Sequence, residues 1–172
     1  FTPVVAVELE FYLLERDAGG RLVPSAGMLS GERRGRIDAY GLGRLDDMSP
    51  LFDDLYASAK ALGLPVRTLM SEYAPGQFEI NFSHNMDPMQ AADWSALFCR
   101  VTRGVALKYG HRASFMAKPY LQYPGSGMHI HVSLYDEAGF NLLARDEQRP
   151  LRHAVAGCLE LLPELMPIYA PN

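Results

Sequence analysis

The chain has 172 residues, of which 48% are hydrophobic and 21% are charged, and its formal net charge is −4. This composition is typical of one globular domain with a sizeable core. The basic residues are spread along the chain, without the stripe that indicates nucleic-acid binding, and the apolar runs are far shorter than a membrane span. We therefore expect partners other than nucleic acids and membranes.

Cys99 and Cys158 each lie in a segment with helical periodicity and form no metal-binding spacing. We interpret them as buried thiols in a reducing compartment, which predicts a cytoplasmic location, while the sequence leaves open whether they pair. The first residues, FTPVVAVELEF, lack the basic region and the cleavage site of a signal peptide. Because a strand pattern begins almost at once without an initiator Met, we expect the chain to be part of a longer protein.

Residues 4–14 alternate in polarity, which predicts a strand with one apolar face (Val5, Val7, Leu9, Phe11) and Glu8 and Glu10 on the other. Residues 15–48 are rich in Gly, Arg and Asp, which predicts a long loop with a short hairpin near DAGGR. Residues 49–63 predict a helix that is capped by Ser49, has Pro50 in its first turn and ends at Gly63. Its expected buried stripe is Phe52, Leu55, Tyr56, Ala59 and Leu62.

Residues 65–70 predict a short strand, and a turn at SEYAPGQ leads to a second alternating strand over 78–84. A helix capped by Asp87 is predicted from about Pro88 to Tyr109, with its end at Gly110. Strands are then predicted at 113–119 and within 123–136, before a last helix from Pro150 to about Leu162. Strands in hairpin-like order, separated by helices, predict an α+β fold with a largely antiparallel sheet.

Three of these strands place chemically active side chains on one face: Glu8 and Glu10, Glu79 with Glu72 across the preceding turn, and His129, His131 and Ser133. Residues i and i+2 of a strand lie about 6.5–7 Å apart, which suits two neighbouring ions better than one. Carboxylates gathered in this way repel one another unless cations lie among them. Oxygen ligands with one imidazole favour Mg²⁺ or Mn²⁺.

Other interpretations of these residues stay open. A single E-x-E on a strand is usually a solvated edge. The pair His129 and His131 would also suit one transition-metal ion in a cupin-like or hydrolytic site that needs neither Glu8 nor Glu10. A cupin, however, needs an acidic partner, and Glu137 lies one residue too far along. The remaining histidines, His84, His111 and His153, are interpreted as surface or core residues.

The motifs VELEF, SEYAPGQFEI, AD at 92–93, ASFMAKP and GSGMHIHVSL occur in the order found in the catalytic domain of the glutamine synthetase family, which the chain resembles over nearly its whole length. PLFDDLY, EINFSHNMDP, FMAKP and PGSGMHIH are most similar to the γ-glutamylpolyamine (γ-glutamylputrescine) synthetase branch. The resemblance implies a partial glutamine synthetase/guanido kinase-like catalytic domain. It also implies a ligase that joins the side-chain carboxylate of glutamate to an amine, a polyamine or ammonia, through an acyl phosphate.

The resemblance further implies ATP as co-substrate and two or more Mg²⁺ or Mn²⁺ ions. Carried over residue by residue, it assigns Glu10, Glu72 and Glu79 to the first ion and Glu8 and His129 to part of the second. It assigns His131 and Ser133 to ATP, and Gly125 to the loop that lines the glutamate pocket.

One position departs from the ammonia-using members of the family. They resemble one another in having Asn before the loop glycine, where this chain has Pro124. An amide and an N–H are lost at this position. The departure favours an amine larger than ammonia.

The family also has a small N-terminal domain, which completes a neighbour's active site in a ring-shaped homo-oligomer. A later segment carries arginines, a base and a final metal carboxylate. Residues 1–172 are therefore predicted to be a central fragment of the catalytic domain, with little ligase activity alone. The alternative function is a non-catalytic module of this family that binds metal and nucleotide.

Overall fold

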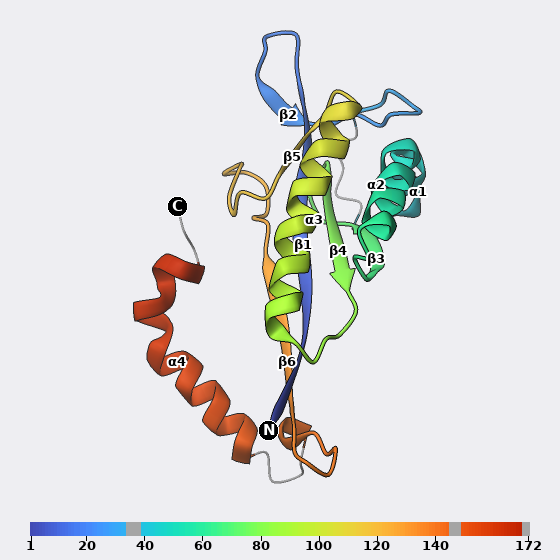
Figure 1. The fold of residues 1–172 in the computed structure, drawn as a ribbon. Helices are drawn as coiled ribbons and strands as arrows, with labels where there is room; N and C mark the ends of the chain where they lie inside the picture. Colours follow the sequence, from blue (N-terminus) through green and yellow to red (C-terminus); the bar gives the residue numbers. More distant parts are fainter. Residues whose placement is uncertain (34–38, 145–148, 170–172) are drawn as a thin grey trace.

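The computed structural model describes residues 1–33, 39–144 and 149–169 (Figure 1). Its elements are β1 Thr2–Arg16, β2 Leu22–Pro24, α1 Leu42–Asp47, α2 Ser49–Ala61, β3 Val66–Ser71, β4 Gln77–Phe82, α3 Pro88–Lys108, β5 Arg112–Ser114, β6 Met128–Tyr135, a 3-10 turn Leu142–Ala144 and α4 Arg149–Tyr169. Every pairing within its six-stranded sheet is antiparallel. The predicted α+β fold with an antiparallel sheet is confirmed.

The long strand β1 organises the sheet, because it pairs with β2, β4, β5 and β6. Its first half pairs with β6, from Thr2 opposite Tyr135 to Leu9 opposite Met128. Its pairing with β4 begins at Glu8, so that Glu8 stands opposite His129 on one side and Asn81 on the other. The register therefore brings the polar faces of three strands together at Glu8.

The apolar face of β1 packs under α3, as Figure 1 shows, and α2 completes the same core beside α3 and β3. Phe11 is fully buried there, and its ring centroid lies 6.1 Å from that of Phe78, 6.4 Å from that of Phe98 and 5.4 Å from that of Phe115. The predicted apolar face (Val5, Val7, Leu9, Phe11) is thus confirmed, but the opposite face is polar only at Glu8 and Glu10, because Ala6, Tyr12 and Leu14 on it are buried as well. The strand therefore has one fully apolar face and one face on which Glu8 and Glu10 lie between buried residues.

The two long predicted helices before residue 110 are present. The carboxylate of Asp87 caps α3 by accepting hydrogen bonds from the N–H groups of Met89 and Gln90, as predicted. In α2, Phe52, Leu55 and Ala59 are buried, but the predictions for three other residues are wrong. Ser49 is the first helical residue and gives no side-chain cap, while Tyr56 (38% exposed) and Leu62 (50% exposed) face solvent. Leu62 follows the last helical residue, which takes it off the buried stripe.

The segment predicted as one long loop contains more structure than expected. The hairpin near residues 17–21 is present, since β1 and β2 pair with Glu15 opposite Val23. Helix α1 was not predicted, because six residues are too few to display a helical period. The predicted strand 113–119 shortens to β5, and residues 115–127 form a loop.

Helix α4 continues beyond Leu162, where the sequence predicted its end, through Pro163 and Pro167. Figure 1 shows it standing away from the sheet, and none of its residues is buried. Cys158 is consequently exposed, contrary to prediction, whereas Cys99 is half-buried, and both thiols are free. Within the described ranges, no helix combines the length and the apolarity needed to cross a bilayer.

Candidate metal and substrate site

The polar face of β1 carries Glu8 and Glu10 side by side, because they are two residues apart on one strand. Glu10 stands opposite Glu79 of β4, and Glu8 stands opposite His129 of β6. The three strands that carry these residues, β1, β4 and β6, are far apart in the sequence. The strand register alone brings them together.

The imidazole of His129 lies among three carboxylates. Its Nδ1 is 3.2 Å from Glu8 Oε2 and 4.0 Å from Glu79 Oε2, and its Nε2 is 3.9 Å from Glu10 Oε1. Ligand atoms of Glu8, Glu79 and His129 all lie within 4.8 Å of one another. This group joins residues that the sequence had assigned to two separate ions, so the two predicted ion sites are neighbours.

His131 also contacts this cluster, with its Nε2 3.0 Å from Glu8 Oε1. Among the described residues, however, the ligand group contains His129 with carboxylates and does not contain His131. Both histidines contact Glu8, so an ion held between them would also meet this carboxylate.

Glu72 reaches the same region from the turn between β3 and β4. Burial and the nearby charge of Glu10 raise the pKa of Glu72. The buried Arg44 of α1 stabilises this turn, because it donates hydrogen bonds to the carbonyl oxygens of Glu72 (2.9 Å) and Ala74 (2.6 Å). Sequence reasoning missed Arg44, because α1 itself was not predicted.

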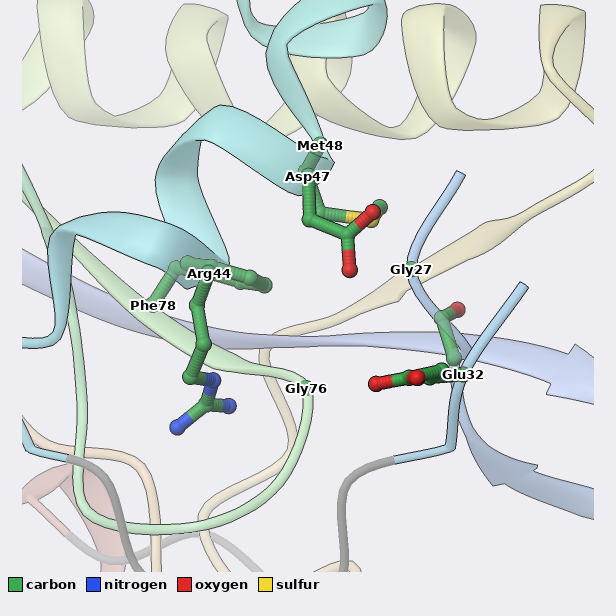
Figure 2. A pocket seen from close by; sticks show the side chains of 8 residues that line it. Gly27, Glu32, Arg44, Asp47, Met48, Gly76 and Phe78 are labelled. Carbon is green, nitrogen blue, oxygen red and sulfur yellow. The ribbon is translucent and has the colours of Figure 1, made fainter. Parts of the chain in front are cut away.

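Figure 2 shows the space between Arg44 and Asp47 of α1 and the segments at Gly27 and Gly76. Its volume of about 30 Å³ admits one or two water molecules. Asp47 accepts hydrogen bonds from Ser30 N–H (2.8 Å) and Ser30 Oγ–H (2.6 Å), which ties α1 to residues 29–30. We interpret the residues around this space as structural, because Arg44 and Asp47 connect α1 to the Glu72 turn and to residues 29–30. We do not assign a substrate to it.

The residues present fit a hard divalent cation. Burial, followed by the charges of Glu8, Glu72 and Glu10, raises the pKa of Glu79, whose side chain is only 7% exposed. A cation would relieve this crowding of negative charge. Asn81 Oδ1 is buried and accepts no hydrogen bond among the described residues, although its Nδ2 donates to Glu8 Oε1 (3.2 Å). Asn81 therefore carries an unsatisfied acceptor beside Glu8 among the described residues.

A cavity of about 360 Å³ opens beside the cluster, on the side of β1 nearer its start. It is lined by Ala6, Glu8, Arg67, Asn81, Phe82, Ser83, His84 and His131. Two of these, Glu8 and His131, were predicted for metal and nucleotide. Ser133, the other predicted nucleotide residue, stands two residues further along β6, opposite Val4.

Arg67 and His84 line this cavity and were not predicted as site residues. His84 is exposed, and all three of the remaining histidines agree with their interpretation as surface or core residues. His111 is a core residue whose Nδ1 lies 2.8 Å from Ser25 Oγ, and His153 lies on the exposed surface of α4.

On the other side of the cluster lies the loop of Gly125. Glu10 N–H donates to the carbonyl of Gly127 (3.0 Å), which fixes the end of this loop against β1. A Cβ atom at Gly125 would stand 2.5 Å from Ala117 O, so only glycine fits there. Gly125, which the motifs singled out, shares the Gln77 amide with Glu10.

The buried Tyr12 stabilises the loop that contains Gly125. Its hydroxyl donates a hydrogen bond to Pro124 O at 2.7 Å. Burial and the charge of Glu10 raise the pKa of Tyr12 to about 12, so the hydroxyl keeps its proton and remains a donor. Neither Tyr12 nor Gln77, which also contacts the loop, was predicted as a site residue.

Residues 1–172 match the family model of the glutamine synthetase catalytic domain. The chain is 39% identical, over 99% of its length, to γ-glutamylputrescine synthetase of Escherichia coli (strain K12), and covers 37% of that protein. It is 36% identical, over 97% of its length, to γ-glutamylpolyamine synthetase of Streptomyces coelicolor, and covers 35% of that protein.

Solved structures agree with the fold. A glutamine synthase homologue is similar with a TM-score of 0.75 at 27% identity, over 96% of this chain and 36% of the other. A GmaS/ADP complex is similar with a TM-score of 0.69 at 29% identity, over 84% of this chain and 32% of the other. The chain thus spans about a third of each of these proteins. As its motifs predicted, the chain belongs to the glutamine synthetase family, within the catalytic domain.

Proposed function

We propose that this chain is the central part of an ATP-dependent ligase that joins the side-chain carboxylate of glutamate to an amine. The observation that carries the proposal is the cluster of Glu8, Glu79 and His129, which lies between a cavity and a glycine loop. Phosphoryl transfer between two bound substrates needs such an arrangement, because its catalysis consists largely of positioning and of charge neutralisation.

The cavity beside His131 is the proposed nucleotide site. It shares Glu8 and His131 with the cluster, so that phosphates bound there would face the carboxylates and any ion between them. Arg67 supplies a positive charge to its lining, and Ser133 lies further along the same strand. The similarity to a structure that holds ADP supports this assignment.

Glu10, Glu72 and Glu79 would hold a first Mg²⁺ or Mn²⁺, and Glu8 and His129 part of a second. Bound there, these ions supply neutralisation of the phosphate charge. The pairing of β1 with β4 and β6 holds Glu8, Glu79 and His129 in place. The loop at Gly125 would keep glutamate close to them.

The proposed reaction proceeds in two steps. An oxygen of the glutamate side-chain carboxylate attacks the terminal phosphorus of ATP, and the bond to ADP breaks. The amine then attacks the acyl carbon of the γ-glutamyl phosphate. Phosphate leaves with the glutamate oxygen, and the amine proton passes to a base outside the residues assigned here.

Pro124 supports an amine larger than ammonia. It carries no N–H, and its carbonyl oxygen already accepts the hydrogen bond from Tyr12 (2.7 Å). This position therefore lacks the side-chain amide and the N–H with which an Asn would hold the substrate. The similarity to synthetases named for putrescine and polyamines supports the same choice, which would place the protein in polyamine catabolism and nitrogen metabolism.

Exposed apolar side chains support the inference that further protein covers this chain. On β6, Met128 (53%), Ile130 (56%) and Val132 (50%) are exposed on the face that continues the core side of β1. On α4, the exposed apolar residues Val155, Leu159, Leu162 and Met166 recur at helical spacing. We infer that the remaining parts of the catalytic domain cover these faces, within a cytoplasmic, ring-shaped homo-oligomer.

The test is phosphate release from ATP by the complete protein with Mg²⁺ and glutamate, comparing putrescine, other primary amines and ammonium. We expect release with a polyamine and little with ammonium. Release with ammonium alone would contradict the assignment of the amine. No release with any amine, together with Mn²⁺ binding, would favour the non-catalytic module.

A further inference from the structure

We propose that Gln77 is a positioning residue whose side-chain amide couples the metal-ligand carboxylate of Glu10 to the substrate loop at Gly125. The inference rests on the proposed function of these two residues and adds a connection between them. Gln77 is the first residue of β4, stands opposite Tyr12 of β1, and is only 1% exposed.

Both ends of the side-chain amide of Gln77 are hydrogen-bonded. Its Nε2 donates to Glu10 Oε2 and to Gly125 O, each at 2.9 Å, and its Oε1 accepts from Ala74 N–H at 3.2 Å. One planar group thus contacts a predicted metal ligand, the loop of the predicted glutamate pocket, and the turn that carries Glu72.

The partners determine which way the amide points. Glu10 Oε2 and Gly125 O are both acceptors, whereas Ala74 N–H is a donor. A reversed amide would set an oxygen against two oxygens and an NH₂ group against an N–H. The amide therefore has one orientation, and its three hydrogen bonds fix the distance between Glu10 and Gly125.

Other contacts hold the same loop but do not replace this coupling. Tyr12 binds Pro124 O, and Glu10 binds Gly127 O through its backbone N–H. Neither contact restrains the carboxylate of Glu10. Without the amide, the Glu10 carboxylate would lose a hydrogen bond of 2.9 Å, and Gly125 O would lose its donor. The Glu10 carboxylate and the carbonyl of Gly125 would then move independently of each other.

The experiment uses Gln77→Met, which preserves length and removes the donor, and Gln77→Glu, which preserves shape and places an acceptor against two acceptors. We expect Gln77→Met to raise the Kd for Mn²⁺ and the KM for L-glutamate about tenfold each, the effect of losing one hydrogen bond to a charged group. The KM for ATP should change less than about twofold, because the cavity at His131 does not include Gln77. Gln77→Glu should give changes at least as large.

The control is Thr102→Val. Thr102 is also fully buried, and its hydroxyl donates only to Phe98 O within α3. This substitution should lower the melting temperature and leave the Mn²⁺ Kd and the glutamate KM unchanged. If Gln77→Met behaves in the same way, Gln77 is merely structural and the proposal is wrong. A weaker Mn²⁺ Kd with an unchanged glutamate KM would refute the coupling.

A failure of the proposed function would be recognised separately, as absence of phosphate release from ATP in the unmodified complete protein. Two readouts would then still decide about Gln77: the Mn²⁺ Kd and the amide hydrogen exchange of residues 123–127. Faster exchange and weaker Mn²⁺ binding in either Gln77 variant support the coupling. Unchanged values in a folded variant overturn it.

Discussion

Replacing Glu79 with glutamine is expected to weaken Mn²⁺ binding by at least about a hundredfold and to raise the melting temperature of the metal-free protein by about 2–4 °C. The first effect follows because a carboxylate ligand is lost. The second follows because burial and the charges of Glu8, Glu72 and Glu10 raise the pKa of Glu79, so that the ionised form is unfavourable in the folded protein. The neutral amide removes this repulsion.

The pH dependence of the melting temperature distinguishes the relief of charge repulsion from the loss of Mn²⁺ binding. Because the pKa of Glu79 is raised on folding from its ordinary value of 4.5, protonation favours the folded state. This stabilisation is fully present below the ordinary value and is lost as the pH rises through the raised one. The advantage of Glu79→Gln over the parent should therefore be largest at neutral pH and vanish in acid.

Thermal unfolding with and without Mn²⁺, at neutral and acidic pH, measures both effects. Glu137→Gln is the matched control, because Glu137 is an exposed carboxylate in the turn after β6. It should change stability by less than about 0.5 kcal/mol and leave Mn²⁺ binding intact. Parent-like Mn²⁺ affinity in Glu79→Gln would contradict the assignment of Glu79 as a ligand.

Replacing Phe11 with alanine is expected to cost about 3–5 kcal/mol of unfolding free energy. Phe11 is fully buried, and its ring packs against Phe78, Phe98 and Phe115, so that its loss would open a cavity where the sheet meets α3. Because Phe11 follows Glu10 on β1, the same change should also disturb the position of the Glu10 carboxylate.

Urea unfolding of the protein measures this loss. Phe140→Ala provides the matched control, because Phe140 is 63% exposed and should change the free energy of unfolding by less than about 0.5 kcal/mol. Equal losses from the two substitutions would mean that Phe11 does not lie in the cooperative core.

The sequence predicted the features that depend on local pattern. The alternation of β1 predicted the buried side of Phe11 and the opposite orientation of Glu8 and Glu10, because each strand residue faces opposite to its neighbour. Asp87 was identified as a cap for a similar reason, since its partners are the next N–H groups along the chain. Motif order singled out His129, which the structure places among the carboxylates of Glu8, Glu10 and Glu79, and Gly125, whose carbonyl shares the Gln77 amide with Glu10.

The supporting residues could not be predicted in this way. Gln77 contacts Glu10 and Gly125, which are 67 and 48 residues away in the sequence, and Arg44 contacts a turn 28 residues away. Such partners become visible only when the strand register is known. The end of α4 was misplaced for another reason: a proline usually ends a helix, but the apolar spacing of Leu162, Met166 and Tyr169 continues through Pro163 and Pro167.

The most direct test of the proposed chemistry follows one oxygen atom. The complete protein would be supplied with ATP, Mg²⁺, putrescine and glutamate whose side-chain carboxylate is labelled with ¹⁸O, and the released phosphate would be analysed by mass. Attack of the carboxylate on the terminal phosphorus predicts one ¹⁸O in each phosphate formed. Phosphate without label would mean that water attacks ATP, which would contradict an acyl phosphate and with it the proposed ligase.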